Sequence, residues 1–256
     1  MRQALLLPAL LGASVIAGCG FAGPETSPRP AARAVTGVTD VAAPVSNPGF
    51  EAWVRAFRPR ALAAGITPAT FDRAMRGATY QPDIIARDRR QAEFTRAIWE
   101  YLDSAVSDTR IENGRKMLAE HRRTVDRIAA QYGVPAEVIV SVWGLESAYG
   151  SFKGTTPIIP ALATLAYDGR RGAMFEAQLI AALKIIQAGD VAPERMTGSW
   201  AGAMGHTQFM PTSYLAYAVD FTGDGRRDIW SDDPTDALAT TAAYLARHGW
   251  TTGQPR

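Results

Sequence analysis

One carboxylate stands alone in an apolar stretch of the chain, "VIVSVWGLESAYGSF", residues 138–152. The spacing predicts a helix over 135–149 that places Glu146 on a stripe of apolar and aromatic side chains. The stripe contains Ile139, Val142, Trp143 and Tyr149. Desolvation and the helix C-terminus both disfavour an anion, so we expect a raised pKa for Glu146. A carboxyl group protonated near neutral pH is suited to act as general acid in glycosidic bond cleavage. The alternative is an exposed Glu of ordinary pKa at the rim of the core.

A second segment, "GSWAGAMGHTQFMPTSY" over 198–214, is dense in glycine, methionine and aromatic residues. Its glycines would let the backbone approach a ligand closely, and Ser199 and Gln208 would offer polar contacts. The aromatic side chains of Trp200, Phe209 and Tyr214 could stack on sugar rings. A tightly packed structural loop is the competing interpretation.

Oxygen-bearing side chains alternate in "DFTGDGRRDIWSDDPTDA", residues 220–237, in the manner of a calcium-binding loop. The series runs through Asp220, Thr222, Asp224, the carbonyl of Arg226, and Asp228. Ser231 occupies the twelfth position, where an EF-hand loop has a bidentate Glu. One of Asp232, Asp233 and Asp236 would then have to close the site. A set of Asx turns without an ion is the alternative.

The elements that must position these groups are predicted to be helical. Helical periodicity and capping residues predict helices over 50–65, 66–77, 93–106, 112–133, 135–150, 170–189 and 236–249. The segment 190–234 is rich in loops and is expected to hold a short hairpin. No long alternating strand pattern appears, so the fold class is mainly α, or α+β with a small β or loop part.

The bulk composition of the 256 residues is that of a globular protein, with 47% hydrophobic and 20% charged residues and a net charge of +2. There is no dense Lys/Arg block, so nucleic acid is not an expected partner. Arg2 and the apolar segment after it predict a signal peptide over 1–19 that ends in "VIAGC", similar to a bacterial lipobox. Cys19, the sole cysteine, would carry the lipid; the alternative is an ordinary signal peptide. Residues 20–48 are expected to form a flexible tether.

Taken together, these segments resemble the membrane-bound lytic murein transglycosylase B family. The similarity covers roughly residues 50–250 and places the catalytic domain at 49–256. It rests on "YGVPAEVIVSVWGLESAYG", "ALATLAYDGRR", "GSWAGAMGHTQFMPTSYLAYAVDFTGDG" and "RHGW", which occur in this order. The resemblance implies a lysozyme-like lytic transglycosylase fold and cleavage of the MurNAc–GlcNAc β-1,4 bond of peptidoglycan.

By this resemblance Glu146 is the only catalytic carboxyl group, acting first as acid and then as base while the muramoyl C6 hydroxyl closes a 1,6-anhydro ring. The chemistry would need no cofactor, and a structural Ca²⁺ would be closed by Asp236. The family's substrate contacts carry over to Ser199, Gln208, Tyr101, Arg170, Arg171, Met204 and Phe209. The arginine pair would face the stem peptide; alternatively, it lies at a solvated helix start. The expected partners are glycan strands and the outer membrane, the latter through the lipid anchor, for a periplasmic monomer.

The family usually continues past the "HGW" motif, whereas this sequence stops at Arg256. In the family, the segment after this motif lines one wall of the cleft. The chain is then either C-terminally truncated or a protein that works without that wall. Two other functions stay open. One is a hydrolytic muramidase of the same fold, which needs a second acid, with Asp168 as the nearest candidate. The other is a peptidoglycan-binding lipoprotein without catalytic activity.

Overall fold

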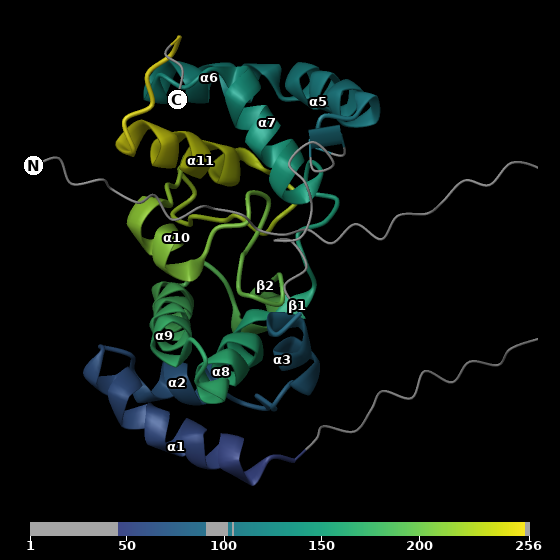
Figure 1. The fold of residues 1–256 in the computed structure, drawn as a ribbon. Helices are drawn as coiled ribbons and strands as arrows, with labels where there is room; N and C mark the ends of the chain where they lie inside the picture. The colour runs from purple at the N-terminus through teal and green to yellow at the C-terminus, as the bar shows by residue number, and fades with distance from the viewer. Residues whose placement is uncertain (1–45, 91–101, 104, 254–256) are drawn as a thin grey trace, which may run out of the picture.

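The computed structural model describes residues 46–90, 102–103 and 105–253. In this part of the chain the structure is dominated by helices (Figure 1). The predicted mainly α class is therefore confirmed. The elements are α1 (Pro48–Ala63), α2 (Pro68–Ala74), α3 (Pro82–Asp88), α5 (Asp108–Glu120), α6 (Arg122–Tyr132), α7 (Ala136–Ser147), β1 (Thr156–Pro157), α8 (Ile158–Asp168), α9 (Gly172–Ala188), η2 (Pro193–Arg195), β2 (Thr197–Gly198), α10 (Pro211–Tyr217) and α11 (Thr235–Arg247).

The helices α1, α2, α3, α8 and α9 gather at the lower end of the molecule in Figure 1. The predicted start of α2 is confirmed, because the side chain of Thr67 accepts a hydrogen bond from the N–H of Thr70 and Pro68 is the first helical residue. Asn47 caps α1 in the same way, through the N–H of Phe50. These two N-terminal caps determine the residues at which α1 and α2 begin.

The helix α8 was not among the predicted helices. Its sequence, "IIPALATLAYD", is apolar on nearly every side, and eight of its eleven residues are buried. Asp168 is the only charged residue in this stretch, so it offers no charged face of the kind that marks a surface helix. Together with α9 it forms the centre of the larger hydrophobic core, against which α1, α2 and α3 pack.

The upper end of the molecule is built from α5, α6, α7 and α11 around a second core cluster (Figure 1). The single helix predicted over 112–133 is wrong: the chain breaks at His121, which ends α5 and precedes α6. None of the α5 residues is buried, whereas α6 buries Val125 and Ile128. The helices therefore pack differently, and tertiary packing overrides local propensity at the break. No single described helix is long and apolar enough to cross a membrane; α6 and α7 reach that length only together, across a bend of 112°.

The β structure is small and lies between the two helical groups. Strand β1 pairs antiparallel with β2, with Thr156 opposite Gly198. Gly198 also bridges to Met204, and Met204 bridges to Phe209. Within 190–234 the described residues show these isolated antiparallel bridges in place of the expected hairpin, and the paired strand β2 has its partner β1 outside that segment.

Candidate active site

Glu146 lies in the last turn of α7 and is half-buried. Burial raises the pKa of Glu146 from 4.5 to about 7. The environment agrees with the predicted apolar stripe, since Ile139 and Trp143 on the same helix are buried. A carboxyl group with this pKa is divided between its acid and base forms near neutral pH, as a group that must both donate and accept a proton requires.

The helix ends directly after Glu146, earlier than the expected stop at Gly150. Ala148, Tyr149 and Gly150 all have positive φ, at 47°, 59° and 83°. Left-handed backbone at residues other than glycine costs roughly 1–3 kcal/mol each and persists only where surrounding contacts hold it. The described residues contain only one further such non-glycine residue, Gln208 at 52°. Unusual backbone is therefore concentrated next to Glu146 and in the glycine-rich segment.

Ser147 holds this turn. Its hydroxyl donates to the carbonyl of His206 at 2.5 Å and accepts from the N–H of Gly150 at 2.9 Å. Its own carbonyl accepts from the N–H of Phe152 at 2.9 Å. Ser147 is fully buried, so its bond to the His206 carbonyl is formed away from water.

Tyr149 folds back along α7 instead of extending its stripe. Its hydroxyl donates to the carbonyl of Arg110 in α5 at 2.7 Å. A Cβ on Gly144 would lie 2.5 Å from that hydroxyl oxygen, so the ring occupies the space that a side chain would take. The turn after Glu146 is thereby attached to α5 as well.

The polar residues of the glycine-rich segment are engaged within the protein. The hydroxyl of Ser199 accepts from the N–H of Ala203 at 3.0 Å. The side-chain amide of Gln208 donates to the carbonyls of Gly205 and Lys153, at 2.8 and 3.1 Å. Gln208 thus connects this segment to the chain just beyond α7. These contacts order the segment, and the predicted sugar contacts of Ser199 and Gln208 stay predictions.

Met204 and Phe209 pack into the larger core and are 0% and 3% exposed. Phe209 also contacts Tyr244 of α11 edge to face. In this structure both side chains support the segment from beneath. Their predicted contact with a glycan stays a prediction and would require the segment to move.

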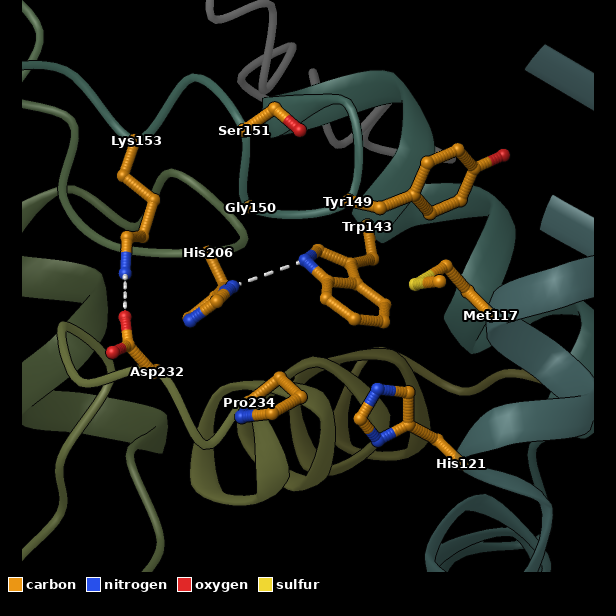
Figure 2. Close-up of a pocket in the computed structure, with 10 residues that line it drawn as sticks. All are labelled: Met117, His121, Trp143, Tyr149, Gly150, Ser151, Lys153, His206, Asp232 and Pro234. Carbon is orange, nitrogen blue, oxygen red and sulfur yellow. Dashed lines mark hydrogen bonds and ion pairs between the residues drawn. The ribbon is translucent and has the colours of Figure 1, made fainter. Parts of the chain in front are cut away.

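A pocket of about 270 Å³ lies beside α7 (Figure 2). Ten described residues line it, and Glu146 is not one of them. The indole of Trp143 donates to Nδ1 of His206 at 3.1 Å, and the amino group of Lys153 faces Asp232. Neither His206 nor Trp143 is expected from the sequence to make polar contacts. The only signal was the lone imidazole in "GHTQF" within an otherwise uncharged segment.

The predicted arginine pair is bound to a buried carboxylate. Asp88, 2% exposed, accepts from Nε of Arg170 at 2.9 Å, and its other oxygen pairs with Arg171. This arrangement differs from a solvated helix start, because two guanidinium groups compensate one buried charge. Asp168, the candidate second acid, pairs with Arg89 at 2.8 Å. This ion pair indicates a structural role for Asp168.

Three predicted metal ligands meet: carboxylate oxygens of Asp220, Asp224 and Asp236 all lie within 4.8 Å of one another. Asp236 is 2% exposed and accepts from the N–H groups of Phe221, Thr222 and Asp228. Burial raises the pKa of Asp236 despite these hydrogen bonds. Three hard carboxylate oxygens in one small space match the ligand preference of Ca²⁺.

The remaining predicted ligands lie around this group. Thr222 donates its hydroxyl to Asp220 at 3.2 Å, and the N–H of Arg226 donates to Asp224 at 2.9 Å. The carboxylate of Asp228 accepts from the N–H groups of Trp230 and Ser231 and is outside the three-carboxylate group. Tyr101 and Cys19 lie outside the described residues.

The mostly helical fold matches the structures of lysozyme-like lytic transglycosylases. A family model described as "Transglycosylase SLT domain" matches residues 49–256. The chain belongs to this family, so the resemblance inferred from the sequence is confirmed.

Individual relatives extend this assignment. The chain is 39% identical over 154 residues to membrane-bound lytic murein transglycosylase B of Escherichia coli K12, covering 60% of this chain and 42% of the relative. A crystal structure of SltB3 from Pseudomonas aeruginosa in complex with NAG-NAM-pentapeptide has 53% identity and a TM-score of 0.78, over 82% of this chain and 56% of that one. The Escherichia coli lytic transglycosylase Slt35 in complex with calcium has 31% identity and a TM-score of 0.70, over 82% of this chain and 65% of that one. The chain thus spans about half the length of these first two relatives.

Proposed function

We propose that the protein is a peptidoglycan lytic transglycosylase that cleaves the MurNAc–GlcNAc β-1,4 bond. The observation that carries this proposal is Glu146, a half-buried carboxyl group of pKa about 7 at the end of α7, in a chain of the transglycosylase SLT domain family. The complexes of SltB3 with NAG-NAM-pentapeptide and with NAG-anhNAM-pentapeptide support the substrate class.

In the proposed reaction, protonated Glu146 donates its proton to the glycosidic oxygen as the bond from that oxygen to muramoyl C1 breaks. The muramoyl C6 hydroxyl then attacks C1, and the Glu146 carboxylate takes the hydroxyl proton. The product is a 1,6-anhydro-muramoyl end, no water is consumed, and Glu146 is again protonated. Because the nucleophile belongs to the substrate, one carboxyl group suffices and the attack gains from proximity. The substrate's N-acetyl group would help to stabilise the oxocarbenium-like transition state.

Ser199, Gln208 and Tyr101 are proposed to contact the sugars near the acid, with Met204 and Phe209 supporting that surface. Arg170 and Arg171 would reach the stem peptide only while they also compensate Asp88, which favours a mainly structural role for the pair. A hydrolytic muramidase is less favoured, because its candidate acid Asp168 is paired with Arg89.

Asp220, Asp224 and Asp236 are proposed to hold a structural Ca²⁺, with Thr222 and the Arg226 carbonyl adding oxygens. The ion would stabilise the loop between α10 and α11, and the chemistry needs no step through it. Slt35, a relative with 31% identity, has been solved with calcium. Periplasmic action at the outer membrane through a lipid on Cys19 stays part of the proposal, and the similarity to a membrane-bound transglycosylase supports it.

Mass spectrometry of the soluble products from purified sacculi tests the proposed reaction. Fragments that end in 1,6-anhydro-muramoyl groups, lighter by one water than hydrolytic products, are the expected result. Reducing muramoyl ends would instead identify a muramidase. Binding to sacculi without release of fragments would identify a binding protein.

A further inference from the structure

We propose that His206 is a positioning residue for Glu146: through Trp143 and Ser147 it holds the last turn of α7 against a fixed loop. The inference rests on the proposed function, because Glu146 is the group that it serves. It deepens that function by assigning a role to a residue that was given none in the proposed acid–base chemistry or sugar contacts.

The first observation is that His206 contacts the end of α7 at three positions. Its Nδ1 accepts from the Trp143 indole at 3.1 Å, and its carbonyl accepts from the Ser147 hydroxyl at 2.5 Å. Trp143 precedes Glu146 by three positions, and Ser147 follows it directly. A Cβ built on Gly150 would lie 2.6 Å from Nδ1 of His206, so the ring also fills the space beside the turn. One residue therefore touches α7 before the acid, directly after it, and at the end of the left-handed turn.

The second observation is that the hydrogen bonds fix the protonation state of the ring. An indole N–H is only a donor, so Nδ1 must present its lone pair. The other nitrogen, Nε2, then carries the proton and donates to the carbonyl of Ser231 at 2.7 Å. Burial lowers the pKa of His206 and so favours the same neutral form. The charged or titratable groups described around this region are His121, Tyr149, Lys153, Asp228 and Asp232.

The third observation is that segment 229–231, which His206 contacts on the side away from α7, is itself held by hydrogen bonds. The carboxylate of Asp228 accepts from the N–H of Ser231 at 3.1 Å, and the amino group of Lys153 donates to the Ser231 carbonyl at 3.1 Å. The backbone N–H of His206 donates to the carbonyl of Ile229 at 3.1 Å. His206 thus connects α7 to a well-bonded segment, 229–231, rather than to a free loop.

The strained turn explains why such a connection is needed. Ala148 and Tyr149 adopt left-handed backbone that their own chemistry disfavours, so the turn would relax if its contacts were removed. A displacement of about 1 Å at a catalytic group can cost a hundredfold in rate. The loss should therefore appear in kcat, while substrate affinity, which depends on other surfaces, changes little.

The test compares four single variants in a sacculus or muropeptide assay. His206→Leu removes both ring hydrogen bonds. Trp143→Phe removes the indole donor and part of the buried ring, and it keeps the Nε2 bond of His206. His206→Gln keeps an acceptor and a donor N–H on one planar group. Thr164→Val is the control, because it deletes a buried hydroxyl in α8 that accepts from the N–H of Gln81 at 3.2 Å, outside this network.

The expected result is a fall in kcat of about tenfold or more for His206→Leu and of a smaller factor for Trp143→Phe, with KM within about twofold of the wild type. His206→Gln should recover most of the loss, and Thr164→Val should lower the melting temperature without lowering kcat. An unchanged kcat in His206→Leu, or no recovery in His206→Gln, would overturn the inference. A wild type that releases no fragments contradicts the proposed function itself, whereas an active wild type with an unaffected His206→Leu contradicts only the positioning role.

Discussion

Asp236 closes the acidic loop that Asp220 begins: their carboxylate oxygens, with one of Asp224, lie within 4.8 Å of one another. Asp236 is buried at the start of α11, whereas Asp220 is exposed. Desolvation acts to raise the pKa of Asp220, but hydrogen bonds from Gly225, Gly223, Thr222 and Asp224 outweigh it, and the pKa is lowered. An anionic Asp220 therefore faces a buried second carboxylate, an arrangement that a divalent cation would stabilise.

Calcium is accordingly expected to raise the melting temperature of the protein. An ion at a hundred times its dissociation constant adds about 2.7 kcal/mol to the free energy of unfolding, which is a shift of several degrees. Differential scanning fluorimetry with and without millimolar CaCl₂ measures the shift. Asp220→Asn should remove most of it, while Asp72→Asn, in the exposed Arg58–Asp72 pair, should keep it. An equal shift in Asp220→Asn and the wild type would contradict calcium binding at this loop.

Local signals in the sequence predicted the parts of the fold that depend on neighbouring residues. Thr67 and Pro68 gave the start of α2, and Pro135 gave the start of α7. The raised pKa of Glu146 followed from its apolar neighbours on the same helix.

Contacts distant in sequence were not predictable in this way. Arg170 pairs with Asp88 across 82 positions, and Ser147 bonds to His206 across 59. No periodicity or capping pattern reports such pairs. The early end of α7 belongs to the same class, because the left-handed conformation of Ala148 depends on contacts that only the folded chain supplies. The break at His121 likewise follows from packing.

Glu146→Gln should abolish turnover while leaving the fold intact. Gln is nearly isosteric with Glu but has no proton to donate to a leaving oxygen, and general acid–base catalysis contributes about 10² to 10⁴ in rate. Release of fragments from sacculi measures turnover, and sedimentation with sacculi measures binding. Glu137→Gln, an acid at the first turn of the same helix, is the matched control and should stay active. Turnover by Glu146→Gln close to that of the wild type would refute the proposed mechanism.

The stability of the wild type relative to Glu146→Gln should depend on pH. The pKa of Glu146 is raised from 4.5 to about 7 on folding, so the folded state binds this proton more tightly than the unfolded state. The stabilisation is fully present below pH 4.5 and is lost as pH rises through 7, because a half-buried carboxylate must then be ionised. The Gln variant carries no such charge, and it should gain up to roughly 3 kcal/mol over the wild type across this interval.

Chemical denaturation of both proteins at pH 4.5, 6 and 8 measures this difference. The gap between their free energies of unfolding should widen with pH and level off above about pH 7. A gap that stays constant over the series would show that Glu146 titrates normally in the folded protein.

Catalysis by an acid of this pKa should also decline above pH 7, where less of it is protonated.

Asp88→Asn should destabilise the protein because it leaves Arg170 and Arg171 without the buried carboxylate that they share. Removing one partner of a buried ion pair costs about 3–5 kcal/mol, and the partial exposure of both arginines lowers this expectation to about 2–3 kcal/mol. Urea denaturation measures the change. Asp72→Asn, which breaks an exposed pair, should cost under about 1 kcal/mol. If Asp88→Asn is as stable as Asp72→Asn, the arginines do not depend on Asp88, and a direct role at the stem peptide becomes the better explanation for the pair.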